Sequence, residues 1–386
     1  MPAENSAEAI ILMDAFAKRT GLISGKTPQR YLWTDAFAVC NFIGLFRASG
    51  ERKYLELALQ LVDQVHRVLG RYRDDDWREG WISGLSEKEG REHPTIGGLR
   101  IGKPLPERKE DEAYDDRLEW DRDGQYFHYL IQWMHALDRL GWVTGDSRYN
   151  RWACELAATA HQAFVRRHDG PNNAAMVWKM STDLSRVLVP SMGQHDPLDG
   201  YVMARQLRSS AAVLGEATAG VTLDTTIHDY RQLLDGIELV TTDPLGIGGL
   251  LVNAFRLVQI EARNMEIDLQ LLERLLAAAY QGLVHYSSGS ELATPAEYRL
   301  AFRELGLAIG LQAVDWLMKA ETASSSRRLM EQLAGYSQLG EQIVSFWRDP
   351  AHRRVAMWRD HVDINEVMLA TCLIPGGFLG GESLNL

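Results

Sequence analysis

The sequence is poor in cysteine and contains no long apolar run. Cys40, Cys154 and Cys372 lie far apart, each in an apolar, helix-like context. This odd, sparse number favours neither a disulfide framework nor a paired metal site, so we expect buried free thiols and no metal or cofactor. Because no stretch of about 18 apolar residues occurs, we expect no membrane span. A basic segment leading into an apolar core is also missing at the N-terminus, so we expect a cytoplasmic protein.

The sequence also has fewer basic than acidic residues. The 386 residues carry a net charge of −11, with 41 Lys and Arg against 52 Asp and Glu. This acidic balance argues against nucleic acid or an anionic membrane as the main partner. Hydrophobic residues make up 46% of the chain, enough for a large core, and 11 Trp and 13 Tyr favour aromatic-lined surfaces. None of these features indicates an oligomeric state.

Alternating, strand-like patterns are scarce, and helical periodicity dominates. The segment 51–70 has one apolar stripe and one charged face, whereas the preceding segment 35–48 is apolar nearly all round. Such patterns are typical of a half-exposed helix and of a helix buried on most sides. The same succession recurs at 123–140 and 146–167. A buried helix followed by an amphipathic helix is therefore a repeating unit of this chain.

The repeat continues to the end of the sequence. Further pairs are predicted at 198–216 with 223–240, 245–263 with 267–287, and 295–321 with 325–348, and the remaining helices 7–21 and 362–374 can pair across the chain ends. The sum is twelve helices, six inner and six outer. This succession resembles the (α/α)6 toroid of the six-hairpin glycosidase superfamily, which includes glucoamylases, unsaturated glucuronyl hydrolases, bacterial mannanases and N-acylglucosamine 2-epimerases.

The resemblance covers the whole chain and rests on architecture, without a diagnostic motif. It implies an all-α fold, a single toroid domain over 1–386 and a carbohydrate substrate; an open α-solenoid is the structural alternative. Two long connections, about 71–122 and about 168–197, precede inner helices. Because long loops in compact domains are usually functional or disordered, we expect both to wall a site on one face.

Polar and aromatic residues gather where the predicted inner helices begin. Each acid taken singly is explained as a helix N-cap, but "LEWDRDGQYFHYL" (118–130) supplies three carboxylates where one cap needs one oxygen. Acids beside tryptophans suit sugar recognition, because an indole covers an apolar sugar face and carboxylates accept hydroxyl hydrogen bonds. The predicted substrate-binding residues are Trp33, Trp120, Gln125, Tyr126, His128, His195, Asp196, Tyr201, Arg303, Trp358, Arg359 and His361.

A glycoside hydrolase is the function that this pattern favours. Glycoside hydrolysis uses one protonated and one ionised carboxyl group, and we predict Asp123 with Asp199 as that pair, with Asp35 and Asp121 as alternates. Asp123 and Asp199 each precede a Gly-aromatic step, which suggests matching positions in two helix pairs. Arg100, Lys103 and Arg108 of the first long loop are further candidates, as cations for an acidic sugar or a phosphate.

Two other functions stay open at this point. A sugar epimerase of the same fold would use ring-lining histidines to move a proton beside a carbonyl group, which suits the near-neutral pKa of imidazole. A non-catalytic toroid that binds a sugar or a protein would show aromatic residues and acids without catalytic geometry.

Overall fold

The computed structural model describes residues 2–167, 174–214, 223–264, 268–319 and 324–380. Its chain divides into two compact units. Unit 1 comprises Met1–Phe16, Gly44–Glu51 and Glu238–Leu386, and unit 2 comprises Ala17–Ile43 and Arg52–Ile237. Two helices, α1 (Pro2–Arg19) and α2 (Leu32–Ser49), contribute residues to both units. The single domain expected over 1–386 stays a prediction.

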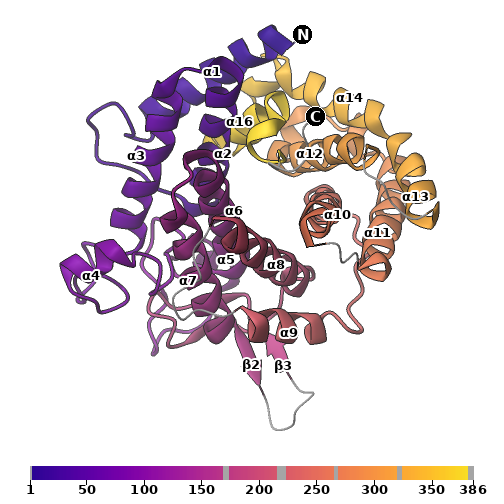
Figure 1. Cartoon of the computed structure of the whole chain (residues 1–386). Coiled ribbons are helices and arrows are strands. Elements are labelled where there is room, and N and C mark those ends of the chain that lie inside the picture. The colour runs from indigo at the N-terminus through magenta and orange to yellow at the C-terminus, as the bar shows by residue number, and fades with distance from the viewer. Residues whose placement is uncertain (1, 168–173, 215–222, 265–267, 320–323, 381–386) are drawn as a thin grey trace. The chain divides into compact units, whose positions relative to one another are not determined.

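Unit 2 is built mainly from helices that pack side by side (Figure 1). Its main helices are α3 (Arg52–Leu69), α6 (Phe127–Thr144), α7 (Ser147–Phe164), α8 (Asp196–Leu214) and α9 (Asp224–Leu233). Helix α6 packs against α7 and α8, and α8 packs against α9. The predicted contrast between buried and amphipathic helices is confirmed here, because α6 is buried along most of its length whereas α3 buries one stripe.

The turn between α6 and α7 illustrates how local sequence sets these boundaries. Gly145 ends α6 in a left-handed conformation, with φ of 69°, which glycine adopts without a steric penalty. Asp146 then caps α7, because its side chain accepts a hydrogen bond from the backbone N–H of Arg148 at 3.0 Å. Two consecutive residues, Gly145 and Asp146, therefore end one helix and begin the next.

Short elements that the sequence pattern does not predict occur in the two long connections and at the ends of the neighbouring predicted helices. The first connection holds the helices α4 (Glu87–Glu92) and α5 (Asp116–Asp121). Three short strands, β1 (Gln125–Tyr126), β4 (Lys179–Met180) and β5 (Val187–Val189), form an antiparallel sheet in the order β1-β4-β5. A second sheet pairs β2 (Val165–Arg167) with β3 (Ala174–Met176). Strands of two or three residues are too short to show an alternating pattern.

Unit 1 carries the second set of packed helices (Figure 1). They are α10 (Pro244–Asn264), α11 (Leu269–Ser288), α12 (Ala301–Leu317), α13 (Ser324–Ala334), α14 (Ser337–Arg348), α15 (Ala356–Arg359) and α16 (Val362–Leu373), with short 3₁₀ turns at Glu291–Ala293, Ala296–Tyr298, His352–Arg354 and Pro375–Gly377. Helices α10 and α12 approach closely at glycines, since a Cβ on Gly310 would lie 2.5 Å from the Cα of Gly248.

Three predicted helices differ most from the structure in their bounds. The segment predicted as 325–348 is two helices, α13 and α14, separated at Gly335 and Tyr336. Helix α9 ends at Leu233 instead of 240, and 295–300 precedes α12 outside the α-helix. These errors share a cause, because periodicity reports which face of a helix is apolar and says little about where its backbone hydrogen bonds stop.

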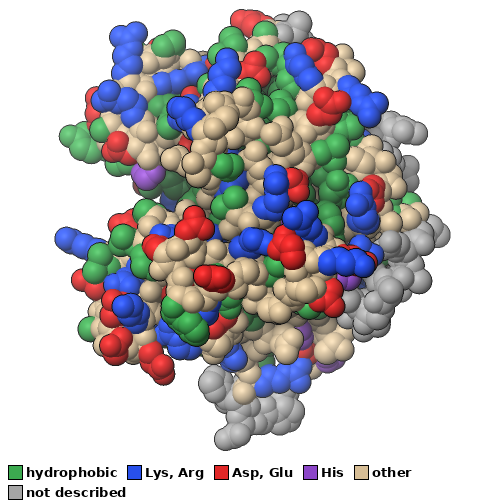
Figure 2. Space-filling model, turned by 90° about the vertical axis from the view of Figure 1, so that its left-hand side faces the viewer, with side chains coloured by type: hydrophobic (Ala, Val, Ile, Leu, Met, Phe, Trp, Pro, Cys, Tyr) green, Lys and Arg blue, Asp and Glu red, His purple; other side chains and the backbone are tan. Residues whose placement is uncertain are grey.

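The N-terminal helix meets the C-terminal part of the chain within unit 1. Glu8 of α1 forms ion pairs with Arg348 at 2.8 Å and with Arg353 at 2.6 Å. These bonds join α1 to the end of α14 and the turn that follows, and its pairing with 362–374 stays a prediction. Within the described ranges, no helix combines the length and the apolar character needed to cross a bilayer. On the face shown in Figure 2, acidic and basic side chains are interspersed.

Candidate functional site

Asp123, directly before the start of α6, is fully buried and held by cations. Its Oδ2 accepts a hydrogen bond from Arg100 Nη1 at 2.5 Å and lies 3.7 Å from Arg73 Nη1. Its Oδ1 accepts hydrogen bonds from the backbone N–H groups of Gly102, at 3.0 Å, and Gly124, at 3.1 Å. Both oxygens thus anchor the loop 71–122 to the start of α6. Asp123 therefore has a structural task here, and its catalytic role stays a prediction.

Asp35, in the first turn of α2, is also buried and engaged. It accepts a hydrogen bond from the backbone N–H of Tyr31 at 2.9 Å, and its Oδ1 lies 3.3 Å from Arg30 Nη1. Arg30 in turn donates to the carbonyl oxygen of Thr20 at 2.6 Å. These contacts fit the helix-cap interpretation of Asp35, and its role as an alternate catalytic acid stays a prediction.

The two other predicted acids retain exposure to solvent. Asp121 is exposed at the end of α5, within electrostatic reach of Lys103. Asp199 is partly exposed in the first turn of α8, beside buried Asp196. Burial, together with the charge of Asp199, raises the pKa of Asp196 to about 7, although the Gly193 N–H donates to its carboxylate at 3.0 Å. Asp196 and Asp199 are therefore two neighbouring carboxyl groups in different environments.

Seven rings of unit 2 form a continuous aromatic cluster. Its members come from the starts of α2 and α6, from α5 and from the residue before β4: Tyr31, Trp33, Trp120, Tyr126, His128, Tyr129 and Trp178. The Trp120 and Trp178 rings meet edge to face at 5.3 Å, and His128 stacks on Trp178 at 5.8 Å. Trp120 is 49% exposed, whereas Trp33 and Tyr126 are buried. The cluster therefore has an exposed edge and a packed interior.

Polar atoms are distributed through this aromatic cluster. The Tyr31 and Tyr129 hydroxyl groups share a hydrogen bond of 2.5 Å, and Trp178 Nε1 donates to His128 Nδ1 at 3.2 Å. Burial lowers the pKa of His128 to about 3, so the ring is neutral at physiological pH. Trp33 Nε1 is buried and has no hydrogen-bond partner among the residues that the structure describes. That indole N–H is a donor available to a ligand or an ordered water.

A buried lysine, Lys179, lies against the aromatic cluster. Lys179 is 0% exposed, and its Nζ donates to the Glu119 carboxylate at 2.9 Å and to the carbonyl oxygens of Glu119 and Arg122 at 2.7 and 2.9 Å. The same ammonium group lies 5.3 Å from the centre of the Tyr126 ring. Lys179 is the residue after Trp178, and Glu119 precedes Trp120. This ion pair therefore fixes the two tryptophans relative to each other.

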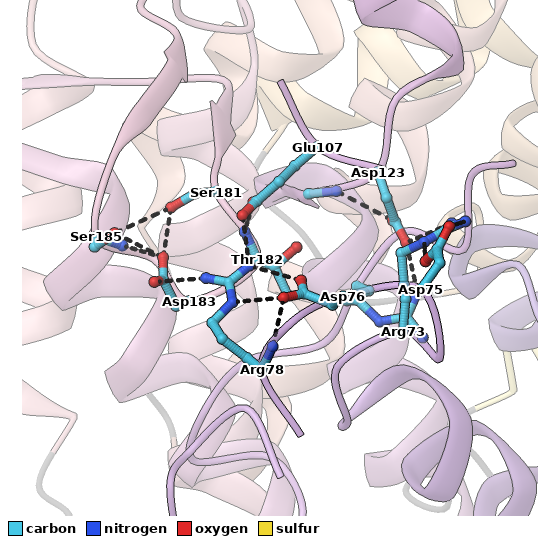
Figure 3. Close-up of polar contacts among 12 residues, drawn as sticks. Arg73, Asp75, Asp76, Arg78, Glu107, Asp123, Ser181, Thr182, Asp183 and Ser185 are labelled. Carbon is cyan, nitrogen blue, oxygen red and sulfur yellow. Dashed lines mark hydrogen bonds and ion pairs between the residues drawn. The ribbon is translucent and has the colours of Figure 1, made fainter. Parts of the chain in front are cut away.

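Ion pairs also join the two long loops (Figure 3). Arg78 contacts Asp76 at 2.8 Å, Glu107 at 2.7 Å and Asp183 at 2.9 Å. Glu107 also accepts a hydrogen bond from the backbone N–H of Thr182 at 2.5 Å. Because Asp76 and Glu107 belong to the first long loop and Asp183 to the second, Arg78 connects the segments on which Trp120 and Trp178 are carried.

Comparisons with known proteins identify the fold. No protein-family model and no curated protein matches the sequence. The α-1,6-mannanase of Salegentibacter sp. HEL1_6 matches in structure with a TM-score of 0.54 at 12% identity, over 96% of this chain and 98% of that chain. An inactive variant of the same enzyme, in complex with α-1,6-mannotetrose, matches with the same TM-score and identity. This chain has an (α/α)6 toroid fold. The all-α fold predicted from the helix pairs is thereby confirmed.

Several predicted substrate-binding residues of unit 2 serve the packing of this toroid. Gln125 is fully buried, accepts from Leu99 N at 2.8 Å and donates to the carbonyl oxygens of Gly97 and Thr182, at 3.0 and 2.7 Å. Its amide is therefore hydrogen-bonded to both long loops, and its contact with substrate stays a prediction. Tyr201 is buried on α8, where its hydroxyl oxygen accepts from Arg205 Nη1 at 3.1 Å. His195 is partly exposed directly before α8, and its role stays a prediction.

The four predicted binding residues of unit 1 differ in exposure. Trp358 is 3% exposed and stacks on Trp347 at 5.6 Å, so it packs in the core, and its binding role stays a prediction. Arg303 is partly exposed and pairs with Asp243 at 2.7 Å. The remaining two, Arg359 and His361, are exposed, and binding by these residues stays a prediction.

The sequence also indicates Tyr31, at the start of an inner helix, and Trp178, in the second long loop, as candidate contacts, whereas Tyr129 lies outside the predicted set. Tyr31 and Tyr129 share a hydrogen bond across 98 residues of sequence, and Trp178 lies on the second long loop. Tyr129 lies in the first turn of α6, in a segment whose apolar pattern indicates core. Within the described part of the chain, no three side chains of His, Cys, Asp or Glu are grouped as a metal site would require.

Proposed function

We propose that this protein is a glycoside hydrolase whose sugar substrate lies against the aromatic cluster. The observation that carries the proposal is the exposed edge formed by Trp120 and Trp178, with polar atoms of Trp33 and His128 nearby. Aromatic rings cover the apolar faces of sugars, and adjacent donors and acceptors bind their hydroxyl groups. The mannanase that shares this fold holds α-1,6-mannotetrose, which supports a carbohydrate ligand here.

The proposed acid and base are Asp196 and Asp199. In glycoside hydrolysis a protonated carboxyl group donates its proton to the leaving glycosidic oxygen. A second, ionised carboxylate either attacks the anomeric carbon or activates water, which supplies the new hydroxyl group. With a pKa of about 7, Asp196 is about half protonated at neutral pH, and Asp199 lies one helical turn further along α8. Asp121, at the end of α5 directly after Trp120, is the alternate acid.

Hydrolysis of a glycoside panel tests this proposal. The panel contains neutral and acidic oligosaccharides, with α-1,6-linked manno-oligosaccharides included because the mannanase shares the fold. We expect turnover of at least one substrate, and a loss of about 10²–10⁴-fold in Asp196→Asn or Asp199→Asn. Asp224→Asn is the matched control, because Asp224 also begins a helix and is exposed. Hydrolysis of no substrate, or full turnover in Asp196→Asn, Asp199→Asn and Asp121→Asn, contradicts the proposal.

The epimerase alternative is weakened by the state of His128. A catalytic base works best when its pKa lies near the working pH, whereas burial holds the pKa of His128 at about 3. Its Nδ1 is also occupied by the Trp178 indole N–H. Substrate isomerisation without hydrolysis in the same panel favours the epimerase, and binding without either reaction favours a non-catalytic toroid.

A further inference from the structure

One lysine of the first long loop stands apart from the other basic side chains around it. In the segment 71–122, seven Lys and Arg side chains are buried or partly buried. Six of them lie within 4 Å of a carboxylate oxygen: Arg71, Arg73, Arg78, Arg100, Arg108 and Arg122. Lys103 is the seventh, and within the described residues its ammonium group has neither a hydrogen bond nor an ion pair, although its backbone carbonyl oxygen accepts a hydrogen bond from Arg73. Every buried or partly buried cation of this loop except Lys103 is therefore paired with a carboxylate.

Lys103 is placed beside the aromatic cluster. Its Nζ lies 5.5 Å from the centre of the Tyr31 ring. Burial lowers the pKa of Lys103, while the charges of Asp121 and Asp123 act in the opposite direction. Asp123 is already bound by Arg100, and Asp121 is exposed to water, so neither neutralises the ammonium group at contact distance. A partly desolvated cation of this kind gains from an anionic partner.

We propose that Lys103 binds the carboxylate of an acidic sugar held on the aromatic cluster, which makes a uronate-containing glycan the substrate class. This inference rests on the proposed function and adds to it the class of sugar that the enzyme prefers. The ammonium group, over the Tyr31 ring, is placed to donate a charge-assisted hydrogen bond to a carboxylate substituent of a sugar held on the cluster. A neutral sugar leaves Lys103 without a counter-charge. A sulfate ester on a sugar has the same charge, so the experiment separates the two anions.

Calorimetric titration of the full chain tests this assignment with matched ligands. The probes are oligosaccharides of glucuronate, galacturonate and mannuronate, each paired with its carboxyl-reduced counterpart, and 6-sulfated gluco-oligosaccharides. We expect at least one uronate to bind about tenfold or more tightly than its reduced form. Lys103→Met removes that preference and leaves binding of the reduced form unchanged. Lys88→Met, which removes an exposed charge of the same loop, keeps the preference.

The outcomes separate this inference from the proposed function. Equal binding of every uronate and its reduced form, binding of neither, or a preference that survives in Lys103→Met overturns the role of Lys103. Tighter binding of the sulfated sugar overturns the assignment to a carboxylate. Hydrolysis of neutral glycosides alone refutes the inference and leaves the proposed function intact. Conversely, Lys103-dependent binding of a uronate without hydrolysis supports the site and refutes the hydrolase.

Discussion

Replacing Asp123 by asparagine separates a structural from a catalytic role for this residue. The substitution keeps the size of the side chain and removes its charge, so the Arg100 guanidinium stays buried without a counter-ion. Asp123 is 0% exposed and Arg100 is 6% exposed, so water screens this ion pair weakly. Removing one partner of a buried ion pair costs about 3–5 kcal/mol. For domains of 150–250 residues, that loss lowers the melting temperature by about 10 °C.

Thermal and urea unfolding measure this effect directly. Asp121→Asn is the matched control, because Asp121 lies two residues away and is exposed, and we expect a change within about 0.5 kcal/mol. In a double-mutant cycle, Arg100→Met combined with Asp123→Asn should cost less than the two single substitutions added together, by about 1–3 kcal/mol. Wild-type stability in Asp123→Asn refutes the structural role. If such a stable variant also lost hydrolysis, the catalytic role predicted from the sequence would return.

Two further predictions concern close packing and pH. Gly248→Ala should destabilise unit 1 by about 1–3 kcal/mol or more, because its new Cβ would overlap the backbone of Gly306. Gly249→Ala, with open space at its Cβ, should instead gain up to about 1 kcal/mol of helix propensity. Equal urea-unfolding midpoints for the two variants contradict this packing. Because the folded-state pKa of Asp196 is raised from 3.8 to about 7, its contribution to stability is present below about pH 4 and is lost as the pH rises through about 7. Asp196→Asn should therefore unfold like the wild type at pH 4 and be more stable by roughly 2–4 kcal/mol at pH 8, and an advantage independent of pH contradicts that shift.

The helices and their alternation could be predicted because their causes are local. Helix α3 has one apolar stripe, whereas α6 is rich in apolar residues on most of its faces. Residues three and four positions apart show this difference, because they lie on one face of a helix. The Gly145–Asp146 turn is a signal of two residues. Repetition of such pairs along the chain was enough to indicate the fold class that the mannanase comparison confirms.

The site depended on contacts that no local pattern contains. "LEWDRDGQYFHYL" shows three acids, yet only tertiary structure decides that Glu119 pairs with Lys179, that Asp123 pairs with Arg100, and that Asp121 stays in water. The Asp123–Arg100 pair joins residues 23 positions apart, and the Glu119–Lys179 pair joins residues 60 positions apart. These residues meet only because the long loops fold back onto the start of α6. The sequence by itself therefore determined the helices, through periodicity along the chain. The tertiary structure alone decided which charges are neutralised, because a charge is neutralised by whichever group the fold brings within a few ångströms.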